Sequence, residues 1–394
     1  MGDVRRIIGA AVDLGSTTIA VSCMDSEGEE AETFSFANPQ HRYGADVVTR
    51  IRYCTEHSNG LSMLSNLVWE ELIFRLKEQL GKRCEELSYI VLSGNTVMQH
   101  IARGLPVDGL GAAPFSPVDL EYREEEIDID WVAGKVALRK FPINGQEKSG
   151  CIAVYPPGFS AFVGADILSG VNHLKMGKSD GYELLVDLGT NGEMLLLGRE
   201  QGFAASTACG PVFDHVLSGA AYGSESIHVI AGCVKRGLID KTGQLAEPFF
   251  EKGIEIDKGF VIRQENIRNF QLAKGAVYAG VMCLLKRAEI TGDEVLNVHI
   301  SGGLGFYLNI RDAFNVRMLP ESFKGKIFSA GNSSLEGAKE LLSALCSTKE
   351  KKLSMNTQKE EILHEYEKIR SRTECYELAG IPEFQELFIQ ALEF

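Results

Sequence analysis

The stretch Leu184-Leu-Val-Asp-Leu-Gly-Thr-Asn-Gly-Glu-Met194 consists of an apolar run, a short polar turn with two glycines, and the start of a second apolar run. This order predicts a β-hairpin in which one strand delivers Asp187 to the turn and a second strand, residues 194–197, leaves it. Glycine supplies positive φ in such a turn, and successive backbone N–H groups there can face an anion. We therefore interpret the stretch as a phosphate-binding hairpin.

A near copy of this hairpin lies close to the N-terminus. The stretch Ala11-Val-Asp-Leu-Gly-Ser-Thr-Thr-Ile-Ala-Val21 aligns with it residue for residue and places Asp13 on Asp187. A single Asp-x-Gly turn is typical of an ordinary hairpin, but two in-register copies indicate a duplicated chain. A second repeated motif is formed by Gly44-Ala-Asp-Val47 and Gly164-Ala-Asp-Ile167. Two facing turns can hold a triphosphate between them, each with a carboxylate toward a divalent metal.

Size and charge limit the classes of function. The 394 residues are 44% hydrophobic, which is enough for two lobes with separate cores, and the formal net charge of −14 disfavours nucleic acid or an anionic membrane as a partner. No apolar run approaches the roughly 20 residues that span a bilayer, and no signal-peptide pattern precedes the first strand. We expect a cytoplasmic protein with small-molecule or protein partners.

The cysteines are scattered singly and form no Cys-x-x-Cys pair. This spacing predicts free thiols and no iron–sulfur cluster on this chain. Cys209 follows a predicted strand, and the sequence leaves open whether it is a redox thiol or a buried apolar side chain. The nine cysteines are Cys23, Cys54, Cys84, Cys151, Cys209, Cys233, Cys283, Cys346 and Cys375.

In the first part of the chain, apolar periodicity predicts strands at residues 6–12, 18–24, 32–36 and 88–93. It predicts helices at residues 44–53, 61–80, 97–103 and 160–174. The turn Gly94-Asn-Thr96 joins a strand to a helix, an arrangement in which helix N-terminal amides face an anion, although Asn95 or Thr96 can equally serve as an ordinary N-cap. Residues 119–130 are strongly acidic, and we expect them to be solvated.

In the second part we expect strands at residues 202–207, 227–234, 254–262 and 297–300. We expect helices at residues 264–290, 333–346, 358–370 and 382–392. Small residues on one face of helix 264–290 predict helix packing between lobes. We expect a first lobe at 1–175, a second lobe at 181–346, and a C-terminal helical segment at 347–394 that packs back on the core.

These parts resemble the actin/Hsp70/sugar-kinase superfamily. The two hairpins look like its two phosphate motifs, Gly302-Gly303 looks like its adenosine motif, and the helices near Val97 and Ala273 look like its interdomain connectors. The resemblance implies an α/β protein with a duplicated actin-like ATPase (ribonuclease H-like) fold, in which two lobes hold the nucleotide in an interdomain cleft.

Within that superfamily the chain is similar to the ASKHA domain of the ATP-dependent reductive activators of corrinoid proteins, and the resemblance covers nearly the whole chain. Asp-Leu-Gly-Thr-Asn-Gly-Glu is the most specific motif. The matching segments are Gly44-Ala-Asp-Val47, Gly94-Asn-Thr96, Ala113-Pro-Phe115, Val163-Gly-Ala-Asp-Ile167, Asp187–Glu193, Cys209-Gly-Pro211, Gln271–Ala276, Gly302-Gly303, Gly331-Asn332 and Tyr376–Phe384.

The resemblance implies that ATP hydrolysis is coupled to the reduction of cob(II)amide to cob(I)amide on a corrinoid protein. Such activators usually carry an iron–sulfur domain, whereas this chain lacks cluster ligands, so we expect a separate ferredoxin-type electron donor. A small-molecule kinase and a nucleotide-gated scaffold remain alternatives, and a homodimer stays open.

Phosphoryl transfer needs positioned phosphates, a divalent metal and an oriented water. We assign Asp13 and Asp187 to a hydrated Mg²⁺ and consider Glu193, Asp166 and Asn95 as candidates for orienting water, with no choice among them from sequence. The residues expected to contact ATP are Gly15, Ser16, Thr17, Thr18, Gly94, Thr96, Gly189, Thr190, Asn191, Gly192, Gly302, Gly303 and Gly305.

Overall fold

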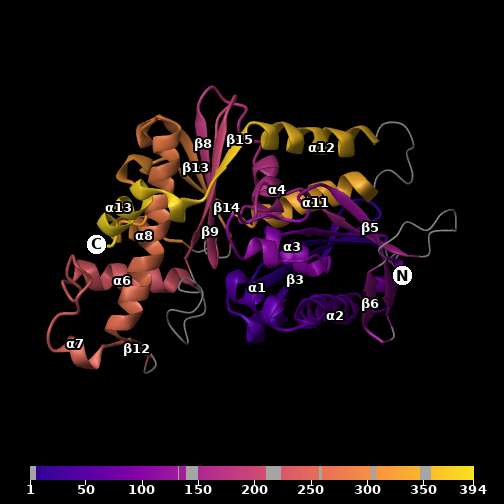
Figure 1. The fold of residues 1–394 in the computed structure, drawn as a ribbon, viewed down its shortest axis with the longest axis horizontal. Helices are drawn as coiled ribbons and strands as arrows, with labels where there is room; N and C mark the ends of the chain where they lie inside the picture. Colours follow the sequence, from indigo (N-terminus) through magenta and orange to yellow (C-terminus); the bar gives the residue numbers. More distant parts are fainter. Residues whose placement is uncertain are drawn as a thin grey trace. The chain divides into compact units, whose positions relative to one another are not determined.

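A computed structural model describes residues 6–131, 133–138, 150–209, 223–256, 260–302, 308–346 and 356–394 (Figure 1). The chain forms two compact units. Unit 1 comprises Met1–Leu174 and Ser333–Ser371, and unit 2 comprises Lys175–Asn332 and Arg372–Phe394. Each unit is built on a mixed β-sheet with helices, which confirms the predicted α/β class.

The sheet of unit 1 has seven strands in the order β3-β2-β1-β4-β7-β5-β6. The central strand β1 pairs antiparallel with β2 and parallel with β4, and β4 pairs parallel with β7. The strands are β1 (Ile7–Leu14), β2 (Thr18–Asp25), β3 (Glu30–Ala37), β4 (Tyr89–Ser93), β5 (Arg123–Asp130), β6 (Lys135–Leu138) and β7 (Cys151–Tyr155).

Helices lie on both faces of this sheet, with α2 and α11 on opposite sides (Figure 1). Even-numbered residues of β1, such as Val12, join the apolar cluster that α2 fills, while Gly9 on the other face approaches Leu342 of α11. This alternation is the period of two that a strand imposes. The helices of unit 1 are α1 (Val47–Glu56), α2 (Gly60–Leu80), α3 (Thr96–Ala102), α4 (Ala165–His173), α11 (Ser333–Cys346) and α12 (Asn356–Ser371).

Helix α11 belongs to unit 1, whereas the sequence placed residues 333–346 in the second lobe. Its close packing on α4 explains the difference. A Cβ on Gly337 would lie 2.2 Å from the carbonyl oxygen of Ser169, so only glycine permits this approach. The predicted boundary followed chain order, which carries no information about a helix that packs beside an earlier element.

Unit 2 has a six-stranded sheet in the order β14-β13-β8-β9-β10-β15. Its first five strands repeat β7-β4-β1-β2-β3 of unit 1 in the same order and with the same parallel and antiparallel pairings. The predicted duplication is therefore present in the fold. The strands are β8 (Tyr182–Leu188), β9 (Asn191–Leu197), β10 (Gly202–Ala208), β13 (Val295–Ser301), β14 (Ile327–Gly331) and β15 (Thr373–Tyr376).

Residues 227–234, which we expected to form a strand, lie in helix α6, so that prediction is wrong. The β-branched residues favoured a strand. Ile227 and Ile230, however, stand three residues apart and are both fully buried, as helical spacing requires. The other elements of unit 2 are α6 (Gly223–Lys235), α7 (Phe249–Lys252), β11 (Ile254–Ile256), β12 (Phe260–Ile262), α8 (Gln264–Arg287), α10 (Ile310–Asn315) and α13 (Pro382–Gln390).

The small residues of α8 pack inside unit 2. A Cβ on Gly280 would lie 2.9 Å from the Met194 side chain of β9, and one on Gly275 would lie 3.3 Å from Leu392. These small residues therefore pack against the unit's own sheet and its C-terminal segment, while the predicted helix packing between lobes stays a prediction. That segment is also not wholly helical, because β15 extends the sheet beside β10. Residues 347–355 of the predicted segment lie outside the described residues.

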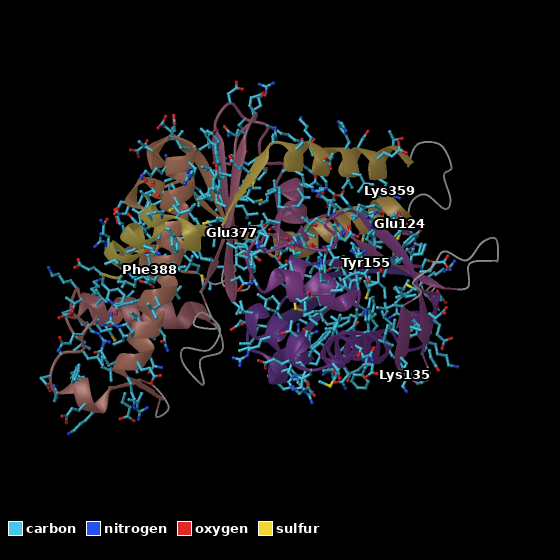
Figure 2. All side chains as sticks on the ribbon, viewed as in Figure 1. Glu124, Lys135, Tyr155, Lys359, Glu377 and Phe388 are labelled. Carbon is cyan, nitrogen blue, oxygen red and sulfur yellow. The ribbon has the colours of Figure 1, made fainter. Side chains whose placement is uncertain are left out.

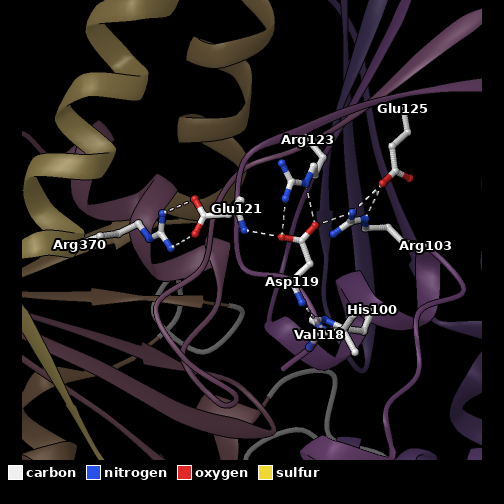
Figure 3. A network of polar contacts seen from close by, with 8 residues as sticks. All are labelled: His100, Arg103, Val118, Asp119, Glu121, Arg123, Glu125 and Arg370. Atoms are coloured by element: carbon white, nitrogen blue, oxygen red, sulfur yellow. Dashed lines mark hydrogen bonds and ion pairs between the residues drawn. The ribbon is translucent and has the colours of Figure 1, made fainter. Parts of the chain in front are cut away.

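Residues 119–130 form β5 and the loop before it, and among them only Ile127 is buried, in agreement with the expected solvated segment. Several of the acidic residues are also paired with cations. Asp119 accepts from Arg103 and Arg123, and Glu121 accepts from Arg370 of α12 (Figure 3). Glu124, labelled in Figure 2, pairs with Lys359 of α12. Glu121 and Glu124 thus pair α12 with β5 and the loop before it.

No helix in the described parts of the chain is both long and apolar enough to cross a bilayer.

Candidate functional site

Asp13 lies at the end of β1, where the sheet gives way to the first predicted phosphate turn. Its carboxylate is half-buried and accepts a 2.8 Å hydrogen bond from Ser334 Oγ of α11. Ser334 Oγ also lies 3.1 Å from Ser93 Oγ, and Ser93 is the residue opposite Asp13 on β4. Hydroxyl contacts therefore fix the carboxylate at the carboxyl end of two parallel strands.

Asp187 has the equivalent position at the end of β8. It pairs in register with Ser301 on β13, and Ser301 Oγ donates to Asp187 Oδ2 at 2.9 Å. Ser301 therefore stands to Asp187 as Ser93 stands to Asp13. The duplication extends from strand order to the residues beside the two carboxylates.

The two turns differ in one carboxylate. Glu193 on β9 is directly opposite Asp187, whereas Ala20 on β2 is opposite Asp13. Side chains of opposed residues share one face, with Cβ atoms about 5 Å apart. Glu193 is 5% exposed. The second turn thus has a buried glutamate opposite its aspartate, whereas the first turn has an alanine at the equivalent position.

Gly15, Gly94 and Gly302 allow a close approach of the backbone around the two turns. A Cβ on Gly15 would lie 2.4 Å from the carbonyl oxygen of Thr18. Gly302 has a φ of +87°, and a Cβ there would lie 2.6 Å from Asp187 Oδ1. Gly94, which follows Ser93 as Gly302 follows Ser301, would meet the carbonyl oxygen of Leu14 at 2.8 Å. Gly189 has no such restriction, since its nearest neighbour would be 3.7 Å away.

The turns also differ in length. In the first turn, four residues, Gly15 to Thr18, lie between the last paired residues of the two strands. In the second turn, three residues, Gly189 to Asn191, lie between them. The first turn therefore has one more residue than the second, and the alignment of the two stretches needs a gap after Ser16 and Thr190. Gly192 is the second residue of β9, where a Cβ would lie 2.7 Å from Thr207 Oγ1, so its small size also serves packing.

The turn Gly94-Asn-Thr96 lies beside the N-terminus of α4. Asn95 caps α3, because its Oδ1 accepts from the Met98 N–H at 2.9 Å. The Ala165 N–H donates to the Gly94 carbonyl at 3.0 Å, which places Asp166 in the adjoining first turn of α4. Asp166 itself accepts from the Ile167 N–H at 2.9 Å. Both Asn95 and Asp166 therefore act in helix N-termini.

Cys209 is buried next to Thr207, with 3.4 Å between Sγ and Oγ1. Burial raises the pKa of its thiol to about 12. The thiolate is the nucleophilic form of cysteine, so this environment favours a buried apolar side chain over a redox thiol. Among the described residues no group of three or more His, Cys, Asp and Glu side chains could hold a metal.

Gly303 and Gly305, expected near adenosine, lie outside the described residues. Sequence reasoning missed four residues that support the aspartates and their turns: Asn38, Arg50, Ser301 and Ser334. Ser301 could have been found from the sequence, because it lies between the predicted strand 297–300 and Gly302-Gly303. Ser334 was not, because it lies 321 residues from Asp13.

Two family models match the chain in succession. Residues 8–179 match the RACo middle region, and residues 217–394 match the C-terminal domain of RACo, the ASKHA domain. A solved structure titled reductive activator for corrinoid, iron-sulfur protein superimposes with a TM-score of 0.81 at 26% identity, covering 100% of this chain and 67% of that one.

Curated relatives agree with this match. The corrinoid activation enzyme RamQ of Eubacterium limosum is 26% identical over 393 residues, which cover 85% of this chain and 64% of the relative. A reductase of Methanosarcina barkeri, specific for the Co(II) methylated-amine corrinoid protein, is 22% identical over 85% of this chain and 69% of its own. The chain thus spans about two thirds of the length of these relatives.

Proposed function

Because the chain belongs to the RACo family, we propose that it is an ATPase that drives reduction of a corrinoid protein from cob(II)amide to cob(I)amide. Its relatives are named for corrinoid activation and corrinoid protein reduction. The observation that carries the ATPase assignment is the repeated serine-held aspartate at a glycine turn. The reduction takes up one electron, which a separate ferredoxin-type iron–sulfur protein would supply.

The residues present fit Mg-ATP. Mg²⁺ keeps several water ligands and binds through one or two carboxylates and phosphate oxygens, and the half-buried aspartate at the end of each strand is a suitable donor of this kind. A Cβ on Gly302 would fill the space beside Asp187 Oδ1, and one on Gly15 would meet the Thr18 carbonyl within the first turn. When bound, Mg-ATP supplies a phosphoanhydride whose hydrolysis is strongly favourable.

Each residue has a distinct role in this proposal. Asp13 and Asp187 hold the metal through water, and their serine partners keep the carboxylates oriented. Glu193 orients the attacking water, since it is the acid opposite Asp187 in the sheet, whereas Asn95 and Asp166 are engaged in helix N-termini. The backbone N–H groups of the two turns bind phosphate oxygens.

ATP acts on the redox step by shifting a conformational equilibrium. A ligand shifts a two-state equilibrium only by its differential affinity for the two states, and about 5.5 kcal/mol moves it from roughly 1:99 to 99:1. ATP binding and hydrolysis provide an input of that order. The proposal therefore requires that the corrinoid protein bind one nucleotide state of this chain more tightly than the other.

The experiment mixes this chain, a cob(II)amide-loaded corrinoid protein from the same source, a ferredoxin-type donor and Mg-ATP under anaerobic conditions. Cob(I)amide is followed by absorbance, with parallel samples that omit ATP or this chain. We expect cob(I)amide only in the complete mixture. Hydrolysis without cob(I)amide, across every corrinoid protein of the source, would contradict the redox role, and ADP release that depends on a hydroxyl or carboxylate acceptor would instead identify a kinase.

A further inference from the structure

Arg50 of α1 is a buried cation that contacts the Asp13 turn from behind. Its side chain is fully buried, and its guanidinium donates to the Ser16 carbonyl, to the Gly44 carbonyl at 3.1 Å and to Gln40 Oε1 at 3.0 Å. The Ser16 carbonyl belongs to the turn that follows Asp13. Burial lowers the pKa of Arg50 to about 10, which leaves the guanidinium charged at neutral pH.

The environment of Arg50 differs from that of the other deeply buried arginine in unit 1. Arg103 lies 2.9 Å from Asp119 and 2.7 Å from Glu125, so its charge is balanced by two carboxylates (Figure 3). Among the described residues no carboxylate forms an ion pair with Arg50, and Asp46 acts on its charge without such a contact. A buried charge without a directly paired counter-ion costs several kcal/mol. An anion bound on the far side of the turn would reduce that cost.

Asn38 completes the support behind the turn. Its Nδ2 donates to the Gly15 carbonyl at 2.8 Å, so two consecutive carbonyls, of Gly15 and Ser16, are directed toward these side chains. In a planar trans peptide the N–H points opposite to the carbonyl. The N–H groups of Ser16 and Thr17 therefore point away from Asn38 and Arg50. Successive N–H groups on one side form an anion-binding concavity.

We propose that Arg50 is a positioning residue that prepares the Asp13 turn for the phosphate groups of a nucleotide. Its guanidinium fixes the peptide between Ser16 and Thr17, and its buried positive charge stabilises the bound anion through the turn. The inference rests on the proposed function, because it takes the ligand of this turn to be a nucleotide phosphate. Arg50 touches neither phosphate nor metal in this role.

The experiment measures dissociation constants for Mg-ATP, Mg-ADP and adenosine by calorimetry in the full chain and in Arg50→Met, Arg50→Lys and Arg103→Met. We expect Arg50→Met to weaken both Mg-nucleotides about tenfold, the effect of one lost charge-assisted interaction, with adenosine affinity unchanged. Arg50→Lys retains the charge without the planar fork and should fall between. Arg103→Met should lower the melting temperature without changing the ratio of ATP to adenosine affinity.

A second variant keeps the inference testable if Arg50→Met does not fold. Asn38→Asp preserves volume and the acceptor for the Gln40 N–H but replaces the donor to Gly15 with a carboxylate oxygen. It should also weaken Mg-ATP selectively. Unchanged Mg-ATP affinity in the folded Arg50 variants, or in Asn38→Asp, would overturn the inference while leaving the proposed function intact. Failure of the unaltered chain to bind Mg-ATP would overturn the proposed function, and the inference with it.

Discussion

Replacing Gly302 by alanine tests whether the Asp187 carboxylate depends on close backbone approach. Two costs follow from the structure. A non-glycine residue at φ +87° costs about 1–2 kcal/mol. The added Cβ would also lie 2.6 Å from Asp187 Oδ1 and 2.7 Å from the Leu188 carbonyl, so the carboxylate must move off Ser301. Losing that charged hydrogen bond adds about 1.5–3 kcal/mol.

Gly302→Ala should therefore lower the free energy of unfolding of unit 2 by about 2.5–5 kcal/mol, the sum of these costs. Gly325→Ala is the matched control. Gly325 has a similar φ of +80°, but a Cβ there would meet nothing within 4 Å. It should lose only the backbone cost of about 1–2 kcal/mol. The difference between the two variants isolates the collision with Asp187.

Both variants are unfolded in urea and followed by circular dichroism. Tryptophan fluorescence does not suit this measurement, because the chain's two tryptophans, Trp69 and Trp131, are in unit 1. Mg-ATP affinity is measured in parallel and should fall only in Gly302→Ala. Equal losses of stability and affinity in the two variants would refute the argument that Gly302 positions the carboxylate.

Two further predictions concern the acidic segment and the cysteines. Burial alone would raise the pKa of Asp119, but hydrogen bonds from Arg123, the Glu121 N–H and Arg103 outweigh it and lower the pKa to about 2. The ionised aspartate therefore stabilises the fold above about pH 4, and the free energy of unfolding should fall by about 2 kcal/mol as the pH falls toward 2. Urea unfolding at pH 7 and pH 2.5 should show this acid-dependent loss, and the same loss in Asp119→Asn would contradict it. Anaerobically purified chain should be colourless, because a cluster needs about four thiolates and these cysteines are dispersed. Stoichiometric iron with a thiolate charge-transfer band would disprove this.

The sequence predicted the repeated core of the fold because the repeat leaves a local pattern. The strands that lead to Asp13 and Asp187, and the long helix at Gly60–Leu80, follow apolar periodicity within a short window. Helix α6 was missed because its β-branched residues satisfy strand preference as well as helical spacing. The edge strand β15 was missed because four residues give too short a pattern.

The site was predictable only where its residues are close in sequence. The two Asp-x-Gly turns carry their own motif, whereas the supports behind them come from distant elements. Ser334 reaches Asp13 from a helix that the sequence assigned to the other lobe. Arg50 resembles any exposed arginine on an amphipathic helix until the fold buries it. Such contacts arise from tertiary packing, which periodicity does not report.

The most direct test of the central claim is the rate of ATP hydrolysis by Asp187→Asn in Mg²⁺, compared with the unaltered chain and with Asp13→Asn. The substitution nearly preserves volume and the hydrogen bond from Ser301 but removes the charge assigned to the metal. We expect Asp187→Asn to retain its melting temperature and to hydrolyse ATP about a hundredfold more slowly. A folded Asp187→Asn protein with the unaltered rate of hydrolysis would contradict the claim that this turn is the ATPase site.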